Sequence, residues 1–190
     1  MKKVFTSLFV IAFVLISLHG AYALEFSADQ ITKHKGEGIT SKIYMKDKKF
    51  RIELKGQPGY TIMRQDKNTV WIVMPEEKSY MEMTLDPNQK PKVEEKFTGE
   101  ISRKLIGSEN INGHTSDKYE VTYKEGNEVQ KVYQWIAKDI NFPIKTAAID
   151  GSWSSEFKNI KMDKQPDNLF EVPSGYEKIS MPMMPGMREF

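Results

Sequence analysis

The feature that most constrains this 190-residue chain is Gly38–Thr84, a run of short segments in which apolar and polar residues alternate. In Lys49–Lys55, for example, Phe50, Ile52 and Leu54 share one parity and charged residues take the other. A period of two predicts β-strands with one buried and one wet face. The turns between the segments are too short for a crossover connection, so neighbouring strands are expected to be antiparallel. The other strands predicted in this run are Lys42–Asp47, Tyr60–Arg64, Thr69–Met74 and Lys78–Thr84.

The same pattern continues on both sides of this run. The further predicted strands are Leu24–Lys33, Arg103–Ile111, Lys118–Lys124, Glu128–Lys138, Ile144–Ile149 and Ser152–Met162. Two of them are separated by Asn112-Gly113, a strong hairpin signal because both residues tolerate positive φ. About 10–11 strands at this spacing predict an all-β, mainly antiparallel fold, either a barrel or a strongly curved sheet.

The stretch between residues 85 and 101 has a different pattern. Val93, Phe97 and Ile101 recur every four residues among charged ones, and Pro91 suits the first turn of a helix. We therefore expect a short amphipathic helix that acts as a lid on the sheet, although Gly99 weakens it by ~1 kcal/mol relative to Ala. A polar linker is the alternative.

Residues 1–23 have the organisation of a secretory signal peptide. A basic head, Met1–Lys3, precedes the largely apolar run Val4–Leu18, and Ala21–Ala23 supplies small residues where signal peptidase needs them. The apolar run is shorter than the ~20 residues of a spanning helix, so a retained anchor is the less favoured alternative. Cleavage after Ala23 predicts an exported protein, periplasmic where the cell has two membranes.

Composition narrows the classes of function. Lys2 and Lys3 account for the formal net charge of +2, so residues 24–190 are neutral overall. Nucleic acid is not an expected partner, because its binding needs a concentrated basic surface. The chain has no Cys, so no disulfide supports the fold and no lipoprotein-type acylation can follow the leader.

Seven short motifs make the chain similar to a known group of exported proteins. They are Lys42–Lys46, Phe50–Glu53, Val70–Pro75, Lys78–Glu82, Ile106–His114, Lys118–Val121 and Leu169–Tyr176. Together they resemble the LolA/LolB-like superfamily, and within it a branch of small periplasmic domains. The resemblance implies an incomplete β-barrel, in which an antiparallel sheet curls around an apolar hollow closed by helices. It also implies a carrier of lipoprotein acyl chains or a sensor of lipidated envelope components, although this chain lacks the carriers' amphipathic helix directly after the leader.

The predicted strands carry more apolar side chains than one covered face can hide. In Thr69–Met74, Val70 and Ile72 point to one face while Trp71 and Val73 point to the other. If about a dozen large apolar side chains stayed exposed, the lost burial free energy would exceed the net stability of a domain. A lid, a partner or an apolar ligand must cover them, or the sheet and lid share an ordinary core. The residues predicted to line an apolar cavity are Phe50, Ile52, Leu54, Ile62, Met81, Met83, Tyr119, Val121, Tyr133, Trp135, Trp153 and Phe157, with Val93, Phe97 and Ile101 on the lid.

The predicted domain spans residues 24–178. The segment that follows it is rich in Met and Pro. Residues 179–190 include Met181, Met183, Met184 and Met187, whose thioethers could serve as soft ligands for Cu(I). No Cys or His accompanies them, so a flexible tail is favoured over a copper site.

Catalysis finds little support in the sequence. His34 and His114 are the histidines after the leader, and the nucleophile, zinc and phosphate-loop motifs are missing. We therefore predict a non-enzymatic periplasmic domain without a cofactor that binds a lipid or the acyl chains of a lipidated protein, with transient membrane contact. The alternative is an envelope protein-interaction or sensor module whose hollow is filled by its own side chains.

Overall fold

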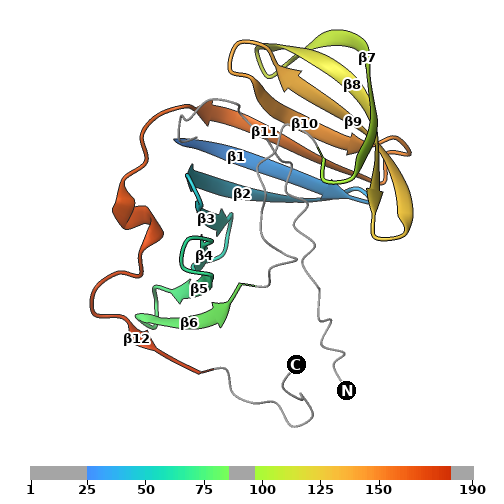
Figure 1. Cartoon of the computed structure of the whole chain (residues 1–190). Helices are drawn as coiled ribbons and strands as arrows, with labels where there is room; N and C mark the ends of the chain where they lie inside the picture. Colours follow the sequence, from blue (N-terminus) through green and yellow to red (C-terminus); the bar gives the residue numbers. More distant parts are fainter. Residues whose placement is uncertain (1–24, 86–96, 181–190) are drawn as a thin grey trace.

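The computed structural model describes residues 25–85 and 97–180, and they form one twelve-stranded sheet (Figure 1). The strands are β1 (Glu25–His34), β2 (Glu37–Lys46), β3 (Lys49–Leu54), β4 (Tyr60–Arg64), β5 (Thr69–Met74), β6 (Ser79–Thr84), β7 (Glu100–Ile111), β8 (His114–Glu125), β9 (Glu128–Ala137), β10 (Phe142–Ala148), β11 (Trp153–Lys161) and β12 (Glu177–Lys178). A single 3-10 turn, η2 (Asp167–Phe170), lies between β11 and β12 within the described residues. The predicted signal peptide, Val93 and residues 181–190 of the predicted Met-rich tail lie outside these residues.

Two antiparallel meanders make up this sheet. Its order is β12-β6-β5-β4-β3-β2-β1-β11-β10-β9-β8-β7, so β1–β6 and β7–β11 are joined through the β1/β11 pair. The sheet does not close, because its edges are β12 and β7 (Figure 1). The prediction of an all-β, mainly antiparallel, incomplete barrel is confirmed. The twelfth strand is the short β12, which pairs in parallel with β6.

The helix expected before β7 does not extend to Ile101. This residue belongs to β7 and is 60% exposed, and Phe97 precedes the turn that leads into the strand. Gly99 has φ +76°, and a Cβ built there would lie 2.6 Å from the Lys124 carbonyl oxygen. The four-residue spacing of Val93, Phe97 and Ile101 therefore ends inside a strand. Gly99 occurs here because the turn needs a residue with positive φ, and it is not a helix residue.

Strand register divides the side chains between two faces. Residues directly opposite in neighbouring strands share a face, and the register runs from Phe50 through Met45 to Phe26. Through β11, β10 and β9 it reaches Val121 on the same side. We call this side the inner face, and the side that carries Ile62 the outer face.

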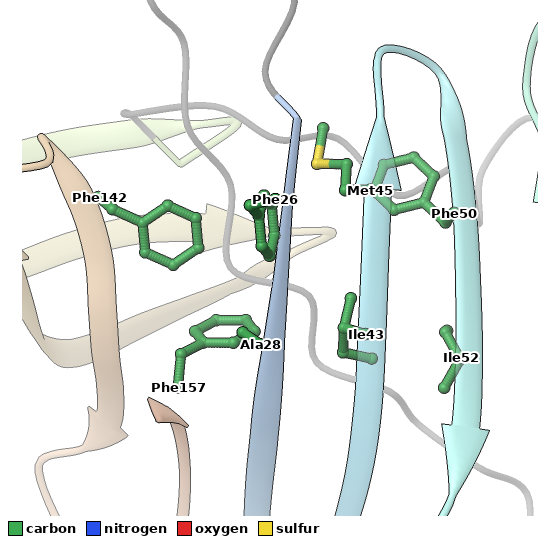
Figure 2. Close-up of a cluster of buried hydrophobic side chains, with 8 residues drawn as sticks. All are labelled: Phe26, Ala28, Ile43, Met45, Phe50, Ile52, Phe142 and Phe157. Atoms are coloured by element: carbon green, nitrogen blue, oxygen red, sulfur yellow. The ribbon is translucent and has the colours of Figure 1, made fainter. Parts of the chain in front are cut away.

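The largest cluster of buried apolar side chains lies on the inner face where the two meanders join. Figure 2 shows its members, which are Phe26, Ala28, Ile43, Met45, Phe50, Ile52, Phe142 and Phe157. The ring of Phe142 packs edge-on against Phe26 at 4.9 Å and against Phe157 at 5.3 Å between centroids. These contacts bring β10 and β11 together with β1 and fix the curvature of the sheet at this point.

The outer face of β3–β6 is covered by the chain that follows β11. Phe170 of η2 is fully buried against Ile62 and Trp71. The guanidinium of Arg64 donates to the Phe170 carbonyl at 3.2 Å and pairs with the carboxylate of Glu171. This segment lies on the side of the sheet away from β7–β9 (Figure 1).

Candidate ligand-binding face

Register separates the twelve residues predicted to line one cavity. Nine share the inner face, namely Phe50, Ile52, Leu54, Met81, Met83, Tyr119, Val121, Trp153 and Phe157. Ile62, Tyr133 and Trp135 lie on the outer face, so they do not belong to one continuous lining with the other nine. Alternation within a strand tells which residues share a side, but not how the sides of different strands correspond. β-Bulges in β7 and β10 shift that correspondence further.

The inner face of β4–β6 is apolar and only half-buried. It carries Met63, Val70, Ile72, Met81 and Met83, and each keeps part of its side chain exposed. Met63, Val70 and Ile72 are not among the residues that the sequence predicts for the lining. The register of β4 against β5 is the signal that groups them, because Met63 lies opposite Val70 and Ile72 opposite Met81.

The opposite side of the same strands is sealed. Ile62 and Val73 are fully buried, and Trp71 is buried beside them. The indole of Trp71 donates to Glu82 at 2.9 Å, and Lys178 pairs with the same carboxylate at 2.6 Å. These two strong contacts hold the pKa of Glu82 below its usual value, with the Lys178 bond as the largest cause. The half-buried inner face therefore differs sharply from the closed outer one.

Beyond β1 the inner face changes from apolar to mixed. Val121 and Val132 are buried there, but so are the polar side chains of Gln134 and Thr146. Arg103 of β7 donates from Nη1 to the Gln134 amide oxygen at 2.8 Å. The interior of this half of the sheet can therefore offer hydrogen bonds as well as apolar contact.

One of the three predicted lid residues lies over the inner face. The ring of Phe97 stacks on Tyr123 with centroids 4.6 Å apart, and burial raises the pKa of this tyrosine. The Phe97 backbone N–H donates to Glu100 at 3.1 Å. Ile101 is exposed on β7 and makes no such cover, whereas Val93 is outside the described residues.

The outer-face aromatics of β9 are covered by both apolar and charged side chains, because Trp135 is buried in a cluster with Ala137 and Ile144 against which Tyr133 packs. The ammonium of Lys118 lies 4.6 Å from the Tyr133 ring centre and 4.8 Å from that of Trp135. The Trp135 indole donates to Glu109 at 2.6 Å, and this bond holds the pKa of that carboxyl below its usual value. These contacts explain how the two aromatic residues are accommodated without lining a hollow.

A cleft of about 390 Å³ lies against the middle of β1 and β2 and the end of β3, and most of the side chains that line it are polar. Its lining is Asp29, Thr40, Ser41, Lys42, Glu53, Leu54, Lys55 and Gln57. Lys42 pairs with Asp29 at 3.3 Å, and Asn159 donates to the same carboxylate at 2.6 Å. The Asn159 bond is the main reason that the pKa of Asp29 is lowered. This cleft is not the apolar hollow that the sequence predicts.

The candidate catalytic and metal-binding groups are dispersed. His114 Nδ1 lies 2.7 Å from an Asp139 oxygen, and this contact lowers the pKa of Asp139. The Ser116 hydroxyl donates to the backbone carbonyl of His114 rather than to its ring. Over residues 25–85 and 97–180, no three His, Asp or Glu side chains gather in a way that could hold a metal ion. In the same residues, no helix is long and apolar enough to cross a membrane.

Comparison with solved structures shows the fold. The chain is similar to MucB, with TM-score 0.54 and 13% identity over 80% of this chain and 58% of MucB. The MucA/MucB complex from Pseudomonas aeruginosa matches with TM-score 0.51 and 14% identity, over 76% of this chain and 54% of that one. A LolA superfamily protein from Nitrosomonas europaea matches over 78% of this chain and 90% of its own, at 12% identity and TM-score 0.35. The two MucB matches show a shared fold, and the chain spans little more than half the length of MucB.

Sequence comparison supplies the family. No curated protein matches this chain. A family model described as a domain of unknown function, DUF4412, matches residues 28–142, which run from β1 to the first residue of β10. More than half of the chain is covered by this match, and it includes the whole half-buried inner face of β4–β6. The chain therefore belongs to the DUF4412 family.

Proposed function

We propose that this protein is a non-enzymatic carrier or binding domain that holds acyl chains or another apolar ligand on the inner face of its sheet. The observation that carries the proposal is the contrast between the two sides of β4–β6. Ile62 and Val73 are sealed on the outer side, while Ile72, Met81 and Met83 stay half-exposed on the inner side. Each methylene moved from water onto such a surface contributes ~0.8 kcal/mol, so a long chain binds without specific polar contacts.

The chemistry of the inner face suits a variable apolar ligand. Met63, Met81 and Met83 lie close together across β4, β5 and β6. Methionine side chains are flexible and polarizable, so they adapt to chains of different shape. Phe97 serves as a lid residue over Tyr123, and its displacement gives a route for release.

The likeness to the LolA superfamily and the leader-like residues 1–23 support the rest of this proposal. A cleaved leader sends the domain to the periplasm, where lipids and lipidated proteins are the available partners. Loading and release then require only transient contact with a membrane. No nucleic acid, metal or cofactor takes part.

A lipid-uptake experiment tests the proposal. Residues 24–190 are purified without detergent, analysed by native mass spectrometry and titrated with a fluorescent fatty acid. We expect a bound species of lipid mass and saturable uptake. Met81→Lys, which places a charge on the inner face, should lower affinity at least tenfold, because an acyl chain would have to desolvate that charge. Val129→Lys is the matched control, because this side chain is 60% exposed on β9. Absence of bound lipid together with absence of uptake would refute the proposal.

A second candidate function rests on the edge strand β7. This twelve-residue strand ends the sheet, and Leu105 is 55% exposed on it beside the exposed Ile106. Unpaired backbone groups on such an edge can take up an extended segment of another protein. MucB, which shares the fold, is known in complex with MucA. Stoichiometric binding of one envelope protein that is lost in Leu105→Lys, without any bound lipid, would favour this function over the carrier.

A further inference from the structure

Buried polar side chains cross the inner face between β1 and β9. Gln30, Ser155, Thr146 and Gln134 are each at most 1% exposed. Ser155 lies opposite Thr146, and Thr146 lies opposite Gln134, so the last three form a continuous row across β11, β10 and β9. At one end of the row the side chains are hydrogen-bonded to each other, because the Gln30 amide donates to the Ser155 hydroxyl at 2.9 Å.

The other end of the row has two unpartnered polar atoms. Among the described residues, nothing hydrogen-bonds to the Gln134 amide nitrogen or to the Thr146 hydroxyl. The orientation of the amide is fixed, because its oxygen accepts from Arg103 at 2.8 Å and its nitrogen must then point elsewhere. Buried polar atoms are nearly always hydrogen-bonded in folded proteins, so a missing partner of suitable chemistry is implied.

The charges around these atoms limit what the partner can be. Arg103 is already paired with Glu100, through contacts of 3.0 and 2.9 Å, and the Glu100 side chain is itself 11% exposed. The pair is therefore neutral, and an incoming carboxylate would be a buried charge without a counterion. A neutral oxygen acceptor can take both free donors, the amide N–H and the hydroxyl, at no such cost.

We propose that Gln134 and Thr146 form a carbonyl seat, which binds the ester or amide carbonyl of an acylated ligand whose chain lies on the inner face. This inference rests on the proposed carrier function and adds a ligand class to it. Val121 and Val132 flank the seat and supply apolar contact for the first carbons of the chain. Opening of the seat is linked to the lid, because the Phe97 N–H bonds to the same Glu100 that holds Arg103.

Two glycerolipids that differ only in the carbonyl test the seat. The affinity of the chain 24–190 is measured for 1-palmitoylglycerol and for 1-O-hexadecylglycerol, an ether with the same head group and chain length. We expect the ester to bind about thirtyfold more tightly, the equivalent of two ordinary net hydrogen bonds. Thr146→Val and Gln134→Leu should each weaken ester binding several-fold and leave ether binding unchanged. Thr122→Val, on the outer face of β8, is the matched control and should change neither.

Each possible result of these measurements either supports or overturns the proposal. Equal binding of ester and ether by the unmodified protein would overturn the seat, with a buried water as the partner of both atoms, and would leave the carrier function intact. Failure of both lipids to bind would refute the carrier function and the seat with it. Palmitate that binds more tightly than the ester, with its affinity lost in Thr146→Val, would overturn the assignment to a neutral carbonyl. If Gln134→Leu does not fold, the ester/ether ratio and Thr146→Val still give the answer.

Discussion

At the scale of single residues, the two faces of β4–β6 separate fully buried side chains from half-exposed ones. Ile62 and Ile72 are identical side chains on adjacent strands. The first is fully buried under η2, whereas the second keeps part of its surface exposed. An apolar side chain that is fully buried under η2 offers no surface to a ligand, whereas a half-exposed one does. The two isoleucines therefore form a matched pair for separating the two roles.

Replacement of each isoleucine by alanine should have opposite effects. Ile62→Ala leaves a cavity in the outer cluster and should lower the free energy of unfolding by about 2–5 kcal/mol, with little change in fatty acid affinity. Ile72→Ala should cost less than half as much stability and weaken fatty acid binding several-fold. Urea denaturation and fluorescence titration measure the two quantities. Equal stability losses with unchanged binding in both variants would contradict the assignment of faces.

Gly99 is a second residue whose conformation has a measurable consequence. Its positive φ and the 2.6 Å approach of a built Cβ to the Lys124 carbonyl oxygen leave no room for a side chain. Its carbonyl also accepts from the Lys124 N–H at 2.9 Å, which joins the start of β7 to the end of β8. Gly99→Ala should therefore destabilise the protein by about 1–3 kcal/mol. A helix at this place would instead be stabilised by alanine, so the sign of the change, measured in urea, separates the two.

At the scale of elements, η2 is fastened to the sheet by one buried cation. The Arg64 guanidinium donates to Asp66 at 2.6 Å, to the Phe170 carbonyl and to Glu171. The bond with Arg64 is the main reason that the pKa of Asp66 is lowered. For Glu171, burial alone would raise the pKa, but the bonds from Arg64 and Lys67 outweigh it and lower the value overall. The attachment of η2 therefore depends on two ionised carboxylates.

Acid should weaken this attachment. Both carboxyl groups have folded-state pKa values below their unfolded ones, so their stabilisation is complete above about pH 4–5 and is lost as pH falls through the folded values. Urea unfolding should show constant stability between pH 7 and 5 and a steep fall below pH 4. In Glu171→Gln the fall should be shallower, because one of the titrating groups is gone. An identical fall in both proteins would mean that Glu171 does not contribute.

Removal of the cation should be felt at neutral pH. Arg64→Met keeps most of the side-chain volume but leaves Asp66, Glu171 and the Phe170 carbonyl without their donor. We expect a loss of about 2–3 kcal/mol, limited because both carboxylates remain partly wet. Native-state proteolysis should then cut first near η2. Unchanged protease resistance of this segment would contradict the role given to Arg64.

The strands were largely predictable from the sequence, whereas the faces and the lid were not. β4 and β5 begin and end at the predicted residues, because alternation and turn chemistry are local signals. Strand pairing decides which residues of β4 share a side of the sheet with which residues of β5, and the sequence does not show this pairing. The sequence therefore predicts the wrong face for Ile62. A four-residue spacing ending at Ile101 fits both a helix stripe and every second position of a strand, and the positive φ of Gly99 decided for the strand. The two-residue strand β12 is too short to carry any period.

At the scale of the whole molecule, the carrier proposal predicts that an apolar ligand binds the half-exposed inner side of the open sheet and not the sealed outer side. The outer side is closed by η2 in one half, and in the other by the apolar cluster around Trp135 and by the Lys118 side chain over Tyr133 and Trp135. The inner side is closed only around the cluster of Figure 2 and the buried row that contains Gln134. The side that a ligand occupies is thus the central claim.

Photo-crosslinking with a diazirine-bearing fatty acid, followed by peptide mass spectrometry, tests that claim most directly. We predict labels on inner-face residues of β4–β6, at Ile72, Met81 or Met83, and competition by an unlabelled fatty acid. Labels confined to the outer face, around Trp71 or Trp135, or labels that an unlabelled fatty acid does not displace, would contradict it.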